Sequence, residues 1–155
     1  MTRNRQIWGC IGAIFGGYLI SFLLPVGEVN ADELIFGWEV FAGFFPLKNT
    51  GELDWTASNL IVWSPNLLLW LGVSCLAVRQ PHFAVVLGMI AVGIATHVML
   101  QIGYFGVGHP NFWISFWTRS GAYVWLASLL MLVITAMVFT IKQWRQTRSL
   151  PMLGE

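Results

Sequence analysis

The chain has 155 residues, of which 57% are hydrophobic and only 10% are charged, and its mean hydropathy is +0.70. A soluble domain of this size carries about 25% charged residues, so the composition excludes an ordinary soluble protein. No basic patch with interleaved aromatic residues lies outside the ends of the apolar runs, which argues against a nucleic-acid partner.

The charged residues are sorted by sign along the chain. Six of the seven acidic residues lie between the first two apolar runs, namely Glu28, Asp32, Glu33, Glu39, Glu52 and Asp54. Six of the eight basic residues lie at the two ends or in a short middle turn, namely Arg3, Arg5, Arg79, Lys142, Arg145 and Arg148. Because basic loops stay in the cytoplasm, this pattern predicts an all-α integral membrane four-helix bundle with both termini cytoplasmic.

Four apolar runs are long enough to be membrane spans of about 20 residues. The predicted spans, within one membrane domain, are residues 6–24, 58–78, 83–105 and 121–141. The first resembles a signal peptide, but its apolar run exceeds the ~7–15 residues of such a core, so a retained helix is expected. Gly12 and Gly16 within it form a G-x-x-x-G pattern, which packs helices together either inside one chain or against a partner.

The predicted extracytoplasmic loop, residues 25–57, contains a segment that is too short to span a membrane yet rich in aromatic residues. Residues 33–45 are therefore expected to form a helix that lies in the outer membrane interface. Residues 109–119 carry several aromatic residues and are expected to form a second cap. The acidic side chains of the loop form a predicted outer rim, consisting of Glu33, Glu39, Glu52 and Asp54.

Polar side chains inside the predicted spans fall mainly in their outer halves. With a helical rise of about 1.5 Å per residue, they form a predicted polar layer of His97, Asn66, Gln101, Ser128, Tyr18, Tyr123 and Trp63. One interpretation is an outward-opening cavity for a small polar or cationic group, a lipid headgroup or a quinone ring. The other is that these groups hydrogen-bond to one another and hold the helices together.

No catalytic or metal-binding pattern is found among these residues. The chain lacks G-x-S-x-G, H-E-x-x-H and a pair of intramembrane aspartates, and Cys10 and Cys75 form no C-x-x-C pair. No cofactor is predicted. A haem or chlorophyll bound through His97 would require a second chain to complete the site, because no second histidine lies at matching depth.

Three local patterns point to a type of protein. They are Gly37-Trp38-Glu39-Val40-Phe41, Trp63-Ser64-Pro65-Asn66, and Gly121-x-Tyr123-x-Trp125-Leu126-Ala127-Ser128. Their combination resembles small four-helix bacterial inner-membrane proteins, most of which have no assigned function. This resemblance implies a multi-pass protein of the bacterial inner (cytoplasmic) membrane, and it implies no catalytic residues.

The sequence therefore favours a non-enzymatic accessory or structural subunit of a larger membrane complex. Its expected partners are membrane lipid and either other membrane subunits or further copies of this chain. Two alternatives remain: a small oligomeric channel or transporter with an outward-facing polar cavity, and a membrane enzyme that acts on lipid or quinone with His97 as proton carrier.

Overall fold

The body of the protein consists of apolar helices, as the hydropathy pattern predicts. The computed structural model describes residues 3–29, 33–38, 55–101, 114–116 and 119–148. The helices are α1 (Arg3–Leu23), α3 (Trp55–Ala77), α4 (Pro81–Gln101) and α5 (Ser120–Arg148). Three of them contain segments long and apolar enough to cross a membrane, namely Arg5–Leu23, Pro81–Leu100 and Ser120–Thr147. The apolar stretch of α3 whose side chains the structure describes, Trp63–Ala77, is shorter. α5 extends about two turns beyond its predicted end.

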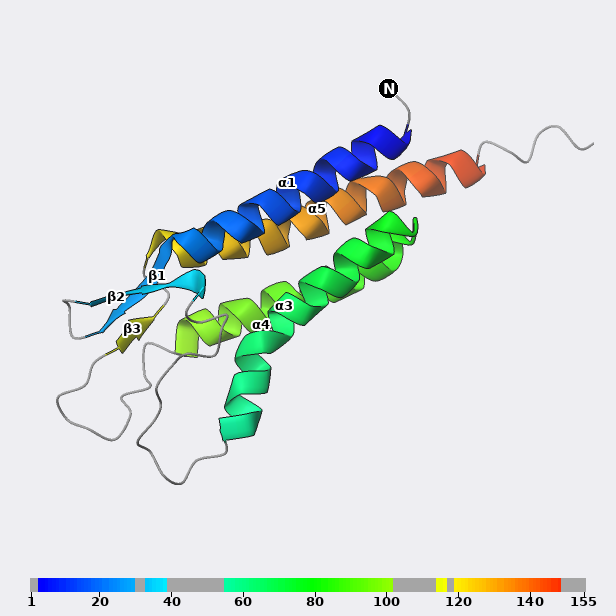
Figure 1. The fold of residues 1–155 in the computed structure, drawn as a ribbon. Coiled ribbons are helices and arrows are strands. Elements are labelled where there is room, and N and C mark those ends of the chain that lie inside the picture. The colour runs from blue at the N-terminus through cyan, green and yellow to red at the C-terminus, as the bar shows by residue number, and fades with distance from the viewer. Residues whose placement is uncertain (1–2, 30–32, 39–54, 102–113, 117–118, 149–155) are drawn as a thin grey trace, which may run out of the picture.

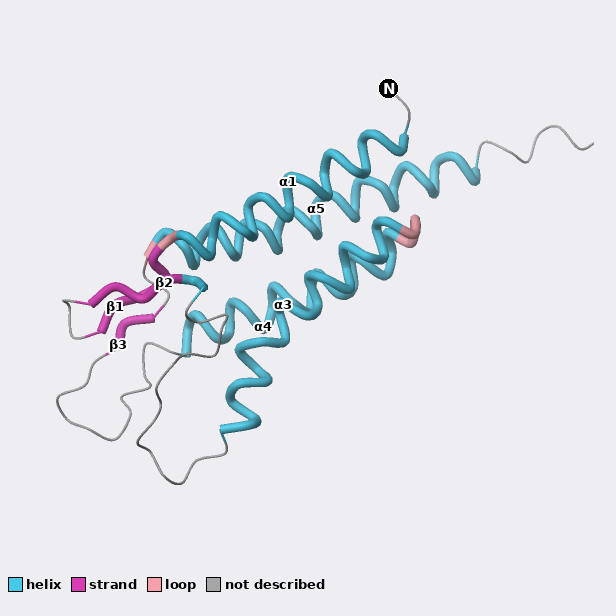
Figure 2. The backbone as a smooth tube through the Cα atoms, in the orientation of Figure 1, coloured by secondary structure: helices cyan, strands magenta, loops and turns pink. Residues whose placement is uncertain are grey.

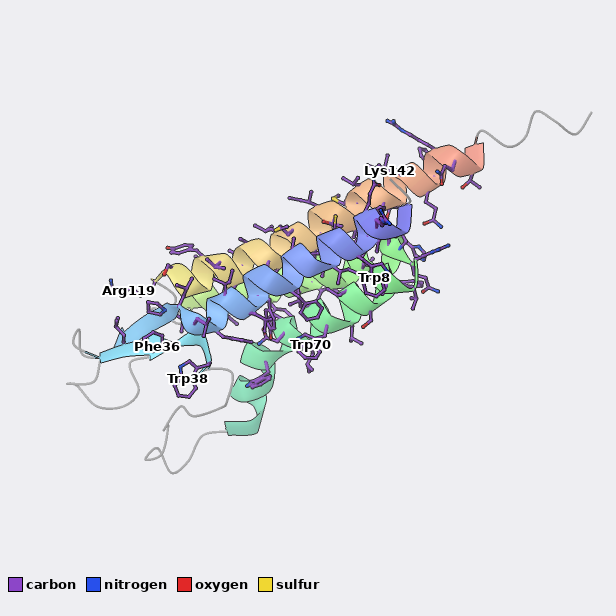
Figure 3. All side chains as sticks on the ribbon, turned by 45° about the horizontal axis from the view of Figure 1, so that its top comes forward. Trp8, Phe36, Trp38, Trp70, Arg119 and Lys142 are labelled. Carbon is purple, nitrogen blue, oxygen red and sulfur yellow. The ribbon has the colours of Figure 1, made fainter. Side chains whose placement is uncertain are left out.

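The helices associate in two pairs that α5 joins. α3 packs along α4, α1 packs along α5, and α5 also packs along α4. The start of α1, the connection between α3 and α4, and the end of α5 lie together at one end of the bundle, which we call the turn end (Figure 1). Trp8 and Lys142 lie toward this end, whereas Phe36, Trp38 and Arg119 lie at the opposite end (Figure 3).

A tight turn connects α3 to α4. The Arg79 N–H donates to the Leu76 carbonyl at 3.1 Å, and the Gln80 N–H donates to the Cys75 carbonyl at 2.8 Å. These two bonds define a Schellman motif, which requires a residue in the left-handed conformation at its corner. Arg79 occupies that corner with φ 63°, where glycine is usual. Pro81 then begins α4, a position where its missing N–H has no cost.

A small antiparallel sheet forms the opposite end, which we call the sheet end (Figure 2). Its strands are β1 (Pro25–Val29), β2 (Glu33–Phe36) and β3 (Ile114–Phe116), in the order β2-β1-β3. The register pairs Glu28 with Leu34 on one side and with Ser115 on the other.

The sheet corrects the start of the helix expected in the first loop. The segment 33–45 was predicted to be an interfacial helix. Its first four residues form β2 instead, Gly37 and Trp38 are helical, and residues 39–45 lie outside the described part of the chain. The predicted second cap, 109–119, contains β3. The backbone N–H and C=O groups of β2 bond to β1, so residues 33–36 need no helix to satisfy these groups.

Glycines set how closely the elements approach. A Cβ on Gly121 would lie 2.8 Å from the Leu24 carbonyl oxygen, so α5 begins directly against the end of α1. In the bundle, a Cβ on Gly72 would lie 2.7 Å from Leu132 Cδ2, and one on Gly88 would lie 2.8 Å from Val133 Cγ2. Leu132 is fully buried. We call this contact of α5 with the two glycines of α3 and α4 the Leu132 contact.

Candidate functional site

The polar and aromatic side chains that face each other between α1 and α3 form the best candidate for a site. Phe15 and Trp70 make an edge-to-face contact with ring centroids 5.9 Å apart. α1 and α3 run in opposite directions (Figure 1), so residues that precede Trp70 on α3 lie level with residues that follow Phe15 on α1. We call the resulting set the α1–α3 seam, and its members are Phe15, Tyr18, Phe22, Trp63, Asn66 and Trp70.

Helical rise sets the levels within this seam. From the Phe15–Trp70 contact toward the sheet end, Tyr18 lies about 4.5 Å along α1 and Asn66 about 6 Å along α3. Phe22 and Trp63 each lie about 10.5 Å from that contact. Residues at three- and four-residue spacing share one helix face, so Phe15, Tyr18 and Phe22 lie on one face of α1, and Asn66 and Trp70 lie on one face of α3.

Asn66 is joined to α5 by a hydrogen bond. The Trp125 Nε1–H donates to Asn66 Oδ1 at 2.9 Å. An indole nitrogen can only donate, so this bond fixes the orientation of the amide, and its NH₂ group points away from Trp125. Among the described residues, the structure records no partner for that NH₂ group.

Tyr18 carries a second polar group that lacks a partner. Its side chain is 0% exposed, and its hydroxyl oxygen has no hydrogen-bond partner among the described residues. The Trp70 indole lies close enough to interact with this hydroxyl but not in hydrogen-bond geometry. A buried hydroxyl without a partner is uncommon, because burial removes its bonds to water without replacing them.

The neighbouring hydroxyls, by contrast, are satisfied within their own helices. Ser21 Oγ donates to the Tyr18 carbonyl at 2.6 Å, and Ser128 Oγ donates to the Val124 carbonyl at 2.9 Å. Ser128 also lies against α1, since a Cβ on Gly17 would be 2.8 Å from its Oγ. Ser128 therefore contributes close packing of α1 on α5, and its hydrogen is not available to a ligand.

Not all of the predicted polar layer meets at this place. Of its members, Tyr18 on α1 lies near Trp70 of α3, Asn66 of α3 is bonded to α5, and Ser128 of α5 lies against α1. Trp63 is three residues from Asn66 and so shares its face of α3. His97 is exposed on α4 instead, because the buried face of α4 consists of the smaller residues Ala84, Gly88, Ala91, Ala95 and Val98.

The other predicted site residues are dispersed or not described. Tyr123 is 59% exposed on α5, and Gln101 is the last residue of α4, where only its backbone is described. Of the predicted acidic rim, Glu33 is the first residue of β2. The rest of the rim, consisting of Glu39, Glu52 and Asp54, lies outside the described residues.

The predicted packing glycines face outward. A Cβ on Gly12 or Gly16 would meet nothing within 4 Å, so neither glycine brings α1 against another described helix. Gly17 brings α1 against α5, and Gly72 and Gly88 bring α3 and α4 against α5. The G-x-x-x-G pattern thus remains available to a partner, which is one of its two predicted uses.

The sequence interpretation did not identify Trp125 as part of the layer. A signal was available, because Trp125 and Ser128 are three residues apart and so share one face of α5. An indole N–H in apolar surroundings also needs an acceptor, and Asn66 is the amide predicted at nearly the same depth. The two residues could have been paired on that ground.

The chemistry that these residues support is hydrogen bonding. The residues that the structure describes contain no cluster of three or more His, Cys, Asp or Glu side chains that could hold a metal ion. Toward the turn end, the side chains buried between the helices are apolar, namely Ile7, Ile11, Val73, Leu76, Ala136 and Phe139. No protein-family model, curated protein or solved structure matches the chain, so the resemblance to small inner-membrane proteins remains a prediction, and function must be argued from the side chains themselves.

Proposed function

We propose that this chain is a non-enzymatic subunit of a membrane complex, inserted with four passages and both termini in the cytoplasm. The observation that supports this proposal is the outer face of α4. Gly93, Thr96 and His97 are exposed there. All three lie within the apolar segment Pro81–Leu100, which is long enough to cross a membrane.

A polar face of this kind is unfavourable against lipid. An imidazole that faces hydrocarbon finds no hydrogen-bond partner there, and ionisable residues in spans usually face a protein interior or a wet cavity. Gly93 leaves open space on the same face, since a Cβ there would meet nothing within 4 Å. A helix of a partner subunit would fit against Gly93 and supply partners for Thr96 and His97.

The transport alternative has less support. A conducting path needs polar or wet surfaces along its whole length, whereas the side chains buried toward the turn end are apolar. The buried side chains described in that half therefore offer no continuous polar path through a single copy. Transport would require several copies to surround a path outside the bundle.

Site-specific photo-crosslinking tests the proposed partner. A photoreactive residue is placed at Leu100, which is 74% exposed one turn from His97, and at Ile134, which is 61% exposed on α5, as the matched control. In native membranes, we expect Leu100 to give a protein adduct that His97→Leu weakens, and Ile134 to give mainly lipid adducts. A monomeric mass in mild detergent together with lipid adducts alone at Leu100 would contradict the proposal.

The topology has its own test. Single cysteines replace Arg79, Lys142 or Arg119 in a chain from which Cys10 and Cys75 have been removed, and each is labelled with a membrane-impermeant thiol reagent in intact and permeabilised cells. We expect positions 79 and 142 to react only after permeabilisation and position 119 to react in intact cells. Labelling of all three positions on the same side would refute the four-passage arrangement.

A further inference from the structure

We infer that the α1–α3 seam binds a lipophilic molecule whose polar head presents a carbonyl oxygen as hydrogen-bond acceptor. Two sources share this chemistry: a quinone ring and the acyl ester of a phospholipid. The inference rests on unused hydrogen-bond donors between aromatic side chains, and it is independent of any partner at the outer face of α4.

The first donor is the Asn66 amide. Its oxygen already accepts the Trp125 indole N–H at 2.9 Å, so the group left over is the NH₂, which carries two hydrogens. An amide held by α5 in this way is oriented before any ligand arrives. Pre-orientation lowers the entropic cost of binding.

The second donor is the Tyr18 hydroxyl. It is fully buried, lacks a partner among the described residues, and lies near Trp70, one turn along α3 from Asn66. Because burial without a hydrogen bond is unfavourable, this hydroxyl destabilises the ligand-free protein. A ligand acceptor that reached it would remove that penalty.

These donors indicate what kind of head fits. A cation is disfavoured because none of the six seam residues is acidic, so the seam supplies no negative charge to balance it. A carbonyl oxygen has two lone pairs and can accept from both Tyr18 and Asn66. The Phe15 and Trp70 rings, which contact each other at 5.9 Å, provide apolar surfaces for a flat ring or an acyl chain.

The shape of α3 offers a way in from the side. Figure 1 shows the first part of α3 turning away from α1 and α5. Pro65 lies inside this helix, and a proline within a helix removes one backbone hydrogen bond and kinks the axis. Contact between α1 and α3 is limited compared with contact between α1 and α5. Trp70, which interacts with the Tyr18 hydroxyl, is 50% exposed, so this side of the seam reaches the surface of the bundle.

Binding of two probes to the purified full-length chain in detergent tests the inference. The probes are a benzoquinone with a ten-carbon tail and a short-chain diacyl phospholipid, each titrated and followed by native mass spectrometry. Tyr18→Phe removes only the hydroxyl, and Tyr123→Phe, at an exposed tyrosine of α5, is the matched control. We expect saturable binding of one molecule of at least one probe, weakened about three- to tenfold by Tyr18→Phe and unchanged by Tyr123→Phe.

The thermal midpoint without probe separates binding from a structural role. Since the hydroxyl makes no bond in the ligand-free protein, Tyr18→Phe is expected to keep or raise the midpoint. Preferential binding of the quinone or of the phospholipid identifies the source of the carbonyl. The inference is overturned if neither probe saturates, or if Tyr18→Phe binds the probe as tightly as the unmodified chain.

Discussion

The Leu132 contact and the α1–α3 seam show two different ways of joining membrane helices. At the Leu132 contact, Gly72 and Gly88 admit an apolar side chain so closely that no Cβ would fit without a shift. In the α1–α3 seam, aromatic rings and two polar groups meet, and the structure gives neither the Tyr18 hydroxyl nor the Asn66 NH₂ group a partner among the residues it describes.

The Leu132 contact stabilises the fold by close packing, whereas the α1–α3 seam carries groups that can form hydrogen bonds. Lipid tails are as apolar as leucine, so helices in a membrane associate through close packing rather than through the hydrophobic effect. At the Leu132 contact, the helices are packed closely in this way. The α1–α3 seam is packed less closely, and it contains polar groups without a partner among the described residues. Such groups are candidates for binding a ligand. Substitutions in the two regions should therefore affect different measurements.

The largest effect is expected from Leu132→Ala. Leu→Ala in a soluble core typically costs about 2–5 kcal/mol. Here we expect about 2 kcal/mol, because lipid solvates an exposed leucine as well as protein does, and only the packing part is lost. Reversible unfolding in mixed detergent micelles measures it. Leu130→Ala, at a side chain that is 43% exposed, is the control and should change little; equal losses would mean that Leu132 is not a packing centre.

Gly88→Ala should have the next largest effect. The added methyl group would lie 2.8 Å from Val133 Cγ2, and overpacking of this kind costs about 1–3 kcal/mol. Gly93→Ala on the same helix adds the same methyl group into open space and should cost nothing. If both variants unfold at the same denaturant concentration, α4 does not approach α5 as closely as described.

The smallest effect belongs to the hydrogen bond between Trp125 and Asn66. A double-mutant cycle with Trp125→Phe and Asn66→Leu should give a coupling of about 0.6 kcal/mol, the average for such bonds in a membrane protein, and no more than about 1.7 kcal/mol. The same variants should change probe binding more than they change stability. A coupling of zero would mean that the indole and the amide do not hold each other in place.

The helices could be predicted from the sequence because length and apolar composition determine them almost alone. The sheet could not. Its strands have three to five residues, and β1 pairs with β3 across most of the chain, so no local pattern fixes them. Glu33 to Phe36 contains apolar and aromatic residues that suit an interfacial helix and a strand equally well, and only pairing with β1 decides between the two.

Part of the candidate site could also be predicted. The depth of Tyr18, Asn66 and Ser128 follows from counting residues along each helix. The direction of a side chain does not, since it depends on which neighbours pack most closely. His97 has the chemistry of an interior residue, but Ala95 and Val98 occupy the packed face of α4. Likewise, the spacing of Gly12 and Gly16 is typical of contact, yet Gly72 and Gly88 make the close contacts.

The short connection at Arg79 has a consequence for how the protein is made. The turn between α3 and α4 is short and is closed by both bonds of a Schellman motif. Two helices joined in this way would enter a bilayer together rather than one after the other. In the proposed four-passage topology, α3, whose described apolar stretch is shorter than those of α1, α4 and α5, would cross the bilayer together with α4 as a helical hairpin. A cationic corner that resists translocation would then set the orientation of the pair.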